Sequence, residues 1–368
     1  MDSRMAVNAI IGGISLFSHH AVFFNFSRHT INSNQELYDP ITKEQLVIDF
    51  LGMKTKREFF CSESYYRQRV AHALRVGLCD FYRWASKRDP SPFPVTLNYP
   101  TIGEEYFEYI DVLESVVHYT QSRPTRPYRF VEIGAGYGHW TMTAHAALKK
   151  LISAPKYEFL LVELDHAKQR MLRSGINLND VSPDHAKIVR AAVGENNDEK
   201  GVLQRGSEGM FGVFGCLPHM LDKAAVQNCK HETSRNVNGK LFAPLKTLKT
   251  LLQPYNKIDM IDIDVQGAEY FVLNNETLQT LDRKVLRVHI GTHGAAPVPG
   301  RALRTSAIDT LYEKELYRLF LSHGWLPRFI MGVTNQGCSQ PFDFRVSHWG
   351  PVCMADGAMS FVNSRFVR

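Results

Sequence analysis

The sequence predicts a doubly wound α/β fold, in which parallel strands alternate with helices that cover both faces of one sheet. Three observations support this prediction. Short apolar runs typical of buried strands alternate with helical patterns after residue 127, the first run ends in a glycine-rich turn, and the second ends in an acidic residue. Strands that alternate with helices imply parallel pairing and right-handed crossovers.

The predicted strands and helices follow one another in regular order. The first five strands are expected at residues 128–133, 157–162, 186–193, 257–264 and 285–291. Helical patterns follow at residues 140–151, 167–178, 268–273 and 307–323. Two more strands, at residues 325–332 and 357–365, have no helix between them. This last pair predicts an antiparallel hairpin that closes the sheet.

Length and composition are those of a globular protein with a large core. The 368 residues are 44% hydrophobic and 22% charged, so one domain with an added lobe, or two domains, are expected. The net charge of +6 is spread along the chain and is too small to indicate nucleic-acid binding by itself. The six cysteines form no C-x-x-C pair, which argues against a zinc knuckle or a redox dithiol and favours reduced thiols.

The N-terminal third has a different character from the rest. The Pro-rich patches Asp89–Pro100 and Ser122–Pro127 are the clearest linker signals, and the apolar spacing in Tyr65–Ala85 predicts a helix before them. We therefore expect a mainly helical lobe over residues 1–100 and a cofactor-binding domain over residues 101–368. The aromatic and arginine side chains of the lobe either line an acceptor site or pack against the second domain, and packing is the preferred interpretation.

Residues 5–26 contain no Asp, Glu, Lys or Arg, so membrane association through this segment is an open alternative. Polar and glycine residues dilute its hydrophobicity, and no small-x-small cleavage site follows a clean apolar stretch. A buried strand or helix is therefore preferred to an anchor, and a cytoplasmic location is preferred to a membrane-anchored one.

The turn after the first predicted strand has glycines at every second position, Gly134, Gly136 and Gly138. Glycine lets the backbone turn tightly and lets a ligand lie against it, although a tight strand-to-helix connection alone has the same composition. The third glycine comes one residue earlier than in the dinucleotide fingerprint, which argues against an NAD-dependent enzyme. The carboxylate of Glu132 would repel a pyrophosphate but suits the cationic amino and sulfonium end of S-adenosylmethionine.

Glu163 is a second predicted contact to the cofactor. It follows the second predicted strand, at a position where an acid can accept hydrogen bonds from both ribose hydroxyls of a nucleoside. Asp165 is expected to cap the following helix instead. The complete set of predicted cofactor-binding residues is Glu132, Gly134, Ala135, Gly136, Tyr137, Gly138, Glu163, Leu164, Ala192 and Asp262.

Three stretches, in the same order along the chain, resemble the FkbM-like family of class I S-adenosylmethionine-dependent methyltransferases. Val131–Thr141 is similar to the first motif of the family, with Gly136 where many members have Asn. Val162–Asn179 resembles the acid-ended second strand and its helix. Ile263–Leu273 (IDVQGAEYFVL) resembles the I-D-V-E-G-x-E motif, with Gln266 in place of the usual Glu, and is the most specific of the three.

The resemblance covers roughly residue 100 to the C-terminus. It implies a seven-stranded, mostly parallel, Rossmann-like sheet that ends in the antiparallel hairpin. It also implies S-adenosylmethionine as the cofactor and methyl transfer to a hydroxyl of a sugar, a glycan or another small-molecule acceptor. The N-terminal lobe and residues 203–244 are the segments expected to contact that acceptor.

The catalytic candidates follow the fourth and fifth predicted strands. Asp262 and Asp264 alternate with isoleucines, so both carboxylates lie on one side of the strand, where two like charges so close would raise the pKa of one of them. Asp264 and His293 are the predicted catalytic pair, because a base near the acceptor hydroxyl can take its proton, and Glu269 is expected to tie down the loop. Alternatively, Asp264 caps the following helix and Asp262 holds the cofactor. A divalent metal on Asp264 and His293 is a weaker hypothesis.

Two other classes of function are open at this point. A nucleic-acid methyltransferase is not favoured, because the loop that would carry an N/D-P-P-Y-like turn reads Asp264-Val265-Gln266-Gly267. A non-catalytic module that keeps the fold for partner binding is the other alternative. The intact glycine turn and Glu163 argue against it. The sequence makes no prediction of oligomeric state.

Overall fold

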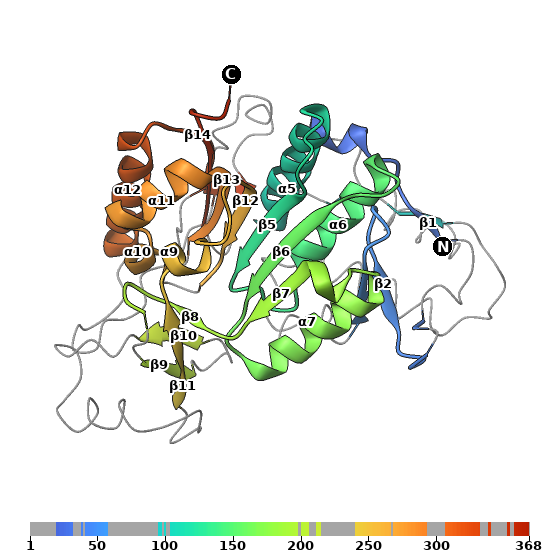
Figure 1. Ribbon diagram of the computed structural model, residues 1–368, viewed down its shortest axis with the longest axis horizontal. Helices are drawn as coiled ribbons and strands as arrows, with labels where there is room; N and C mark the ends of the chain where they lie inside the picture. The colour runs from blue at the N-terminus through green and yellow to red at the C-terminus, as the bar shows by residue number, and fades with distance from the viewer. Residues whose placement is uncertain are drawn as a thin grey trace.

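One seven-stranded sheet organises the protein (Figure 1). Its strands, in spatial order, are β14 (Trp325–Met331), β17 (Gly357–Asn363), β13 (Val285–Thr292), β12 (Ile258–Ile263), β5 (Tyr128–Ile133), β6 (Tyr157–Val162) and β7 (Ala186–Val189). All pairs are parallel except those that β17 makes with β13 and with β14. The doubly wound fold and the closing antiparallel hairpin are therefore confirmed.

This computed structural model describes fourteen segments of the chain. They are residues 20–31, 38–39, 41–57, 95–97, 99–100, 104–197, 200–205, 211–214, 240–265, 268–292, 306–331, 338–339, 352–353 and 357–367.

Helices cover both faces of the sheet (Figure 1). One face carries α5 (Glu104–Gln121), α6 (His139–Leu151) and α7 (His166–Leu178), and the other carries α9 (Leu248–Leu251), α10 (Glu269–Val272), α11 (Asn275–Lys284) and α12 (Ser306–Ser322). Side chains of each strand alternate between the two cores. Along β6, Phe159 and Leu161 join one core and Leu160 and Val162 join the other, as the two-residue period of a strand requires.

The third predicted strand, over residues 186–193, is wrong as a single element. The chain leaves the edge of the main sheet after Val189, and β8 (Ala192–Val193) pairs instead with β11 (Lys240–Lys246). A smaller sheet results, with the order β10-β9-β11-β8, in which β9 is Lys200–Arg205 and β10 is Phe211–Phe214. The split follows from the pairing, because β7 pairs with β6 whereas β8 pairs with β11.

The helix α5 is an element that the sequence analysis did not predict. It precedes β5, and the predicted linker at residues 122–127 is the loop that joins the two. Its buried side chains Phe107, Ile110, Leu113 and Val116 have helical spacing and pack against the first core.

The described part of residues 1–100 consists of a short 3-10 helix, η1 (Ala21–Asn25), and two small two-stranded sheets. β1 (Thr30–Ile31) pairs with β4 (Val95–Thr96), and β2 (Leu46–Ile48) pairs with β3 (Lys54–Lys56). The helix predicted at residues 65–85 lies outside the described residues, as do residues 5–19 of the uncharged N-terminal segment. No helix among the described residues is long and apolar enough to span a membrane.

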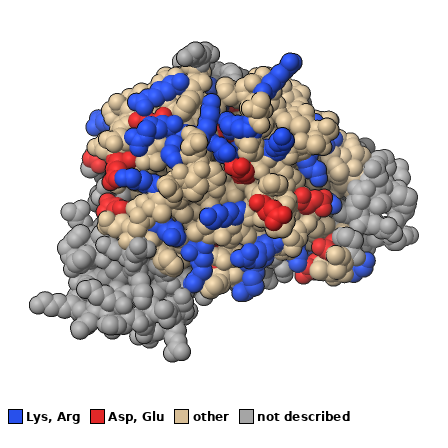
Figure 2. Space-filling model, in the orientation of Figure 1, with Lys and Arg blue, Asp and Glu red and all other residues tan. Residues whose placement is uncertain are grey.

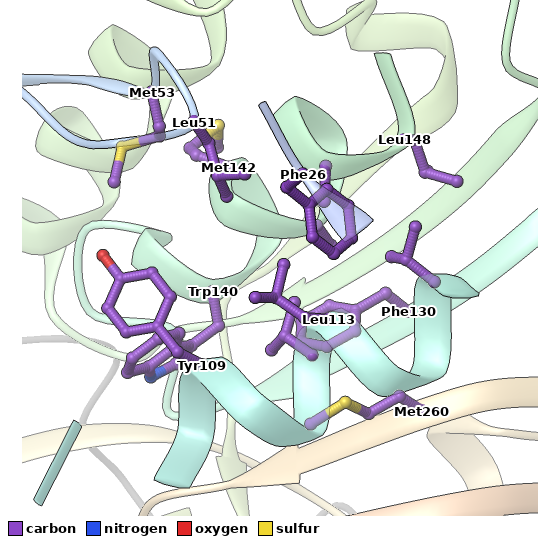
Figure 3. Packing of buried hydrophobic residues seen from close by; sticks show 14 of the residues in the cluster. Phe26, Leu51, Met53, Tyr109, Leu113, Phe130, Trp140, Met142, Leu148 and Met260 are labelled. Carbon is purple, nitrogen blue, oxygen red and sulfur yellow. The ribbon is translucent and has the colours of Figure 1, made fainter. Parts of the chain in front are cut away.

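These N-terminal residues pack into the same core as the sheet. Figure 3 shows Phe26 and Leu51 beside Leu113 of α5 and Met142 of α6, with Phe130 of β5 nearby. All five side chains are nearly inaccessible to solvent. The division at residue 100 stays a prediction, but the described N-terminal residues contribute directly to the core beneath the sheet.

Three further elements complete the described chain. A second 3-10 helix, η3 (Pro183–His185), leads into β7, and β15 (Cys338–Ser339) pairs with β16 (Val352–Cys353) as a two-stranded ladder between β14 and β17 in the sequence.

Candidate functional site

The glycine turn after β5 adopts left-handed backbone angles, with φ of +86° at Gly134, +56° at Gly136 and +82° at Gly138. A Cβ atom on Gly134 would lie 1.7 Å from the carbonyl oxygen of Asp264, so the end of β12 requires glycine there. A Cβ on Gly136 would meet nothing closer than 4.0 Å. Gly136 is therefore the position where the turn faces open space and where a ligand can lie against the backbone.

Glu132 of β5 binds the first turn of α6 through hydrogen bonds. The N-cap of this helix is Gly138, which has no side chain to bind the free N–H groups of the first turn. Thr141 provides the link instead: its backbone N–H and its hydroxyl both donate to Glu132 Oε2, the first at 3.0 Å. Glu132 is only 2% exposed, and burial raises its pKa to about 7 against the effect of these hydrogen bonds.

Glu163 joins the end of β6 to the glycine turn. Its Oε2 accepts from Gly136 N at 2.7 Å, and its Oε1 accepts from Asp165 N at 2.7 Å. Gln169 of α7 donates to the backbone carbonyl of Glu163, also at 2.7 Å. Burial raises the pKa of the Glu163 carboxyl. The backbone N–H of Leu164 also acts on this carboxylate, which has about four lone-pair positions in all, so acceptor capacity is left for a hydroxyl-bearing ligand.

The remaining predicted cofactor residues differ in position. Ala135 is buried, and its N–H donates to the carbonyl of Val162. Tyr137 is partly exposed, with its ring 5.8 Å from the ring of His139. Leu164 is buried next to Glu163, whereas Ala192 is buried in β8, outside the seven-stranded sheet.

Asp262 lies near the carboxyl end of β12, the central strand of the sheet. In the strand register it is opposite Glu132 of β5 on one side and His289 of β13 on the other. It is 2% exposed, and its Oδ1 has no hydrogen-bond partner among the described residues. Burial, together with the nearby carboxylates of Glu132, Asp264 and Asp111, raises the pKa of Asp262 well above its usual value.

Asp264 follows β12 and lies directly against the glycine turn, because its N–H donates to the carbonyl of Ile133 at 2.8 Å. The N-cap of α10 is Ala268, whose side chain makes no cap hydrogen bond, and the capping role considered for Asp264 stays an alternative. The prediction for Glu269 is confirmed: Oε1 accepts from Val265 N at 2.9 Å and holds the loop. His293, the other predicted catalytic residue, lies outside the described residues.

A buried charge network beside this edge was missed by the sequence analysis, because it depends on α5. Asp111 accepts from Arg287 Nη1 at 2.6 Å and contacts His289 Nδ1 at 2.8 Å. Glu114, one turn further along α5, binds Arg287 at 2.8 Å and Arg328 at 3.0 Å. The helical spacing of the two acids, at positions i and i+3, is the signal in the sequence that points to one helix face.

The structure brings most of the predicted site together at one place. The carboxyl ends of β5, β6 and β12 hold the glycine turn, Glu163 and Asp264, with Glu132 and Asp262 beneath them. Ligands of doubly wound sheets bind at this edge. The strand order, with its single antiparallel strand, and the glycine turn beside Glu163 define a class I methyltransferase fold.

Residues 132–310 match the family model of the methyltransferase FkbM domain. The match covers the region that contains the three sequence motifs and agrees with their resemblance to the FkbM-like family. Comparison with curated protein sequences found no match.

The solved structures that the chain is similar to are distant in sequence. The methyltransferase FkbM from Methylobacillus flagellatus KT is 11% identical, with 81% of this chain and 58% of that chain covered and a TM-score of 0.34. An O-methyltransferase from Bacillus cereus, in complex with SAH, is 13% identical, with 71% and 82% covered and a TM-score of 0.32. The precorrin-6y C5,15-methyltransferase from Geobacter metallireducens GS-15 is 9% identical, with 73% and 92% covered and a TM-score of 0.34.

Proposed function

We propose that the protein is an S-adenosylmethionine-dependent methyltransferase that methylates a hydroxyl oxygen of a sugar, a glycan or another small molecule. The observation that carries this proposal is the glycine turn, where Gly136 faces open space and donates its N–H to the buried carboxylate of Glu163. The match of residues 132–310 to the FkbM domain supports the same class of reaction.

The residues at the turn suit each part of this cofactor. The remaining acceptor capacity of the Glu163 carboxylate serves the ribose hydroxyls, and Leu164 and Ala192 offer apolar surface for the adenine. Ala135 and Tyr137 flank the open side of the turn. Burial and repulsion between neighbouring carboxylates raise the pKa of Glu132 and of Asp262 beneath the turn, and a cation above them would favour their charged forms.

When bound, S-adenosylmethionine would supply the methyl group as an electrophile on its sulfonium sulfur. The protein has to hold the acceptor hydroxyl in line with that methyl group and to keep water out. Asp264, at the end of β12 beside the turn, and His293 are the proposed bases that take the hydroxyl proton as the oxygen attacks. A base in this position contributes a factor of roughly 100 to 10,000 in rate.

A small-molecule acceptor is preferred to a nucleic acid. On the face shown in Figure 2, Lys and Arg side chains are scattered among acidic and uncharged ones and form no continuous stripe among the coloured residues. The net charge of +6 on 368 residues is also modest for a protein that binds a phosphate backbone.

The acceptor class is tested with methyl-labelled S-adenosylmethionine. The purified full chain is incubated with fractionated small molecules and glycans from its source, and separately with total RNA. We expect label on a hydroxyl of a sugar-containing or other small molecule, identified by mass and by its resistance to conditions that cleave methyl esters. Label recovered only in RNA would contradict the proposed acceptor. No label in any fraction, from a protein that binds the cofactor, would contradict methyl transfer itself.

The catalytic pair is tested by Asp264→Asn and His293→Ala. Each variant should lose a factor of roughly 100 to 10,000 in turnover, since a general base is removed, while its affinity for the cofactor changes little. Glu276→Gln, a change of an exposed carboxylate on α11, is the control that should keep wild-type turnover. Full turnover in both site variants would show that the assignment is wrong.

A further inference from the structure

Three ligand-type side chains from three different elements meet beside the predicted cofactor edge. Glu108 comes from α5, Asp262 from β12 and His289 from β13, and one ligand atom of each lies within 4.8 Å of the other two. Asp262 and His289 are direct partners in the strand register, and α5 packs across both strands. This trio differs from Asp264 and His293, the pair for which the sequence suggested a metal.

The surroundings of the Asp262 carboxyl favour a cation between these three side chains. Its side chain is almost fully buried, and Oδ1 has no hydrogen-bond partner among the described residues. A buried polar atom without a partner is costly, and a buried charge more so. The charged groups that act on Asp262 are the carboxylates of Glu132, Asp264 and Asp111, which add repulsion instead of relieving it.

His289 is oriented as metal-binding histidines are. Its Nδ1 lies 2.8 Å from Asp111 Oδ2, and because a carboxylate only accepts, the ring donates from Nδ1. The lone pair of a neutral ring is then on Nε2, which faces Glu108 Oε1 at 3.9 Å. Asp111 is itself fixed by Arg287. A carboxylate that orients a histidine in this way is the usual outer partner of a metal ligand.

The spacing of the trio suits an ion better than a direct hydrogen bond. A distance of 3.9 Å between Nε2 and Oε1 is too long for a hydrogen bond. An ion held at about 2.1 Å from each ligand would bring the ligand atoms to about 3 Å from one another. Glu108, whose side chain is 12% exposed, is the longest of the three side chains and can make this small adjustment.

We propose that Glu108, Asp262 and His289 bind one divalent transition-metal ion. One imidazole with two carboxylates suits Zn²⁺ or Mn²⁺ better than Mg²⁺, which prefers oxygen ligands alone. The ion links α5 to β12 and β13 just below the cofactor edge and neutralises the buried carboxylates. Three protein ligands leave at least one position for water. The proposal concerns binding and does not depend on methyl transfer.

Calorimetric titration of the EDTA-treated full chain with ZnCl₂, and separately with MnCl₂, tests the proposal. We expect one ion per chain and a higher unfolding temperature on saturation. Glu108→Gln and Asp262→Asn should each weaken binding by more than about a hundredfold, beyond the roughly 10–100-fold that the loss of an outer partner costs. Glu276→Gln, which removes an exposed carboxylate of α11 that is not part of the trio, should bind the metal ion like the wild type.

Both site variants remove a negative charge from a crowded cluster, so the metal-free proteins should stay folded, which thermal unfolding without metal checks. The proposal is overturned if the wild type takes up no stoichiometric ion of either metal. It is also overturned if the two site variants bind as tightly as Glu276→Gln, because the ion then sits elsewhere. An unfolding temperature that drops in Glu108→Gln without any metal effect in the wild type would show a plain ion pair between Glu108 and a protonated His289.

Discussion

Gly134 and Gly136 both have a positive φ angle, but their surroundings differ. A Cβ on Gly134 would collide with the backbone of Asp264, whereas a Cβ on Gly136 meets open space. The left-handed region by itself costs a non-glycine residue roughly 1–2 kcal/mol. Gly134 therefore ties the turn to the end of β12, and Gly136 keeps the turn accessible.

We predict that Gly134→Ala destabilises the protein by clearly more than Gly136→Ala, which serves as the matched control. Both variants carry the backbone cost of about 1–2 kcal/mol, and only the first adds a clash with the Asp264 carbonyl oxygen, 1.7 Å away. Urea unfolding of both variants measures the difference. Equal losses of stability would show that the approach of β12 to the turn is looser than described.

At the scale of single residues, the sequence predicted which side chains lie near one another better than it predicted the contacts that each one makes. The glycine turn and Glu163 were identified from their positions after two strands, and Asp165 caps α7 as expected. The use of Glu132 by Thr141 was not predicted, because a side-chain partner nine residues away depends on the angle between β5 and α6. His293 stays a prediction.

The start of α6 depends on one buried side-chain contact. Thr141 and Thr143 are both fully buried in this helix, two residues apart. The hydroxyl of Thr141 donates to Glu132, whereas the hydroxyl of Thr143 has no hydrogen-bond partner among the described residues. The two threonines therefore form a natural comparison.

We expect Thr141→Val to reduce the free energy of unfolding by about 1–3 kcal/mol, because it leaves the buried Glu132 carboxylate with one donor fewer. Thr143→Val removes an unsatisfied hydroxyl and should be neutral or slightly stabilising. Chemical denaturation at pH 8, above the raised pKa of Glu132 of about 7, compares the two. A loss in Thr143→Val as large as in Thr141→Val would contradict the capping role of Glu132.

At the scale of elements, two central strands were predicted closely, whereas one helix and the break between two strands were missed. The bounds of β5 and β6 agree with the predicted runs, since both strands are apolar on both faces. The helix α5 was overlooked although Phe107, Ile110 and Leu113 carry its period. The break between β7 and β8 follows from a partner, β11, that lies about fifty residues later in the sequence, and local pattern carries no information about it.

At the scale of the whole molecule, residues on both sides of the predicted boundary share one core. Phe23 is fully buried, with its ring 5.0 Å from Tyr106 of α5, whereas its neighbour Phe24 is 67% exposed. If the two parts form one cooperative unit, loss of packing at Phe23 must lower the stability of the sheet as well.

Phe23→Ala should cost about 3–5 kcal/mol, the usual loss for a large buried aromatic side chain. Phe24→Ala, the control, should change stability by less than about 0.5 kcal/mol. Calorimetric unfolding should show one transition for both proteins, shifted only in the first. Two separate transitions, with the later one unaffected by Phe23→Ala, would show that the N-terminal residues unfold as an independent lobe.

The topology of the whole sheet was predictable because it follows from the order of strands and helices and from the missing helix before the last strand. The contact between the N-terminal residues and the sheet could not be predicted. Apolar residues in short strands and a 3-10 helix show no periodicity that indicates what they pack against.

The central claim is that the turn at residues 134–138 and Glu163 bind S-adenosylmethionine, and calorimetric titration of the full chain tests it most directly. The account predicts binding of one S-adenosylmethionine per chain, with no comparable binding of NAD⁺. It also predicts a loss of at least about tenfold in affinity, about 1.4 kcal/mol, in Glu163→Gln. Preference for NAD⁺, absence of S-adenosylmethionine binding, or unchanged affinity in a folded Glu163→Gln protein would contradict it.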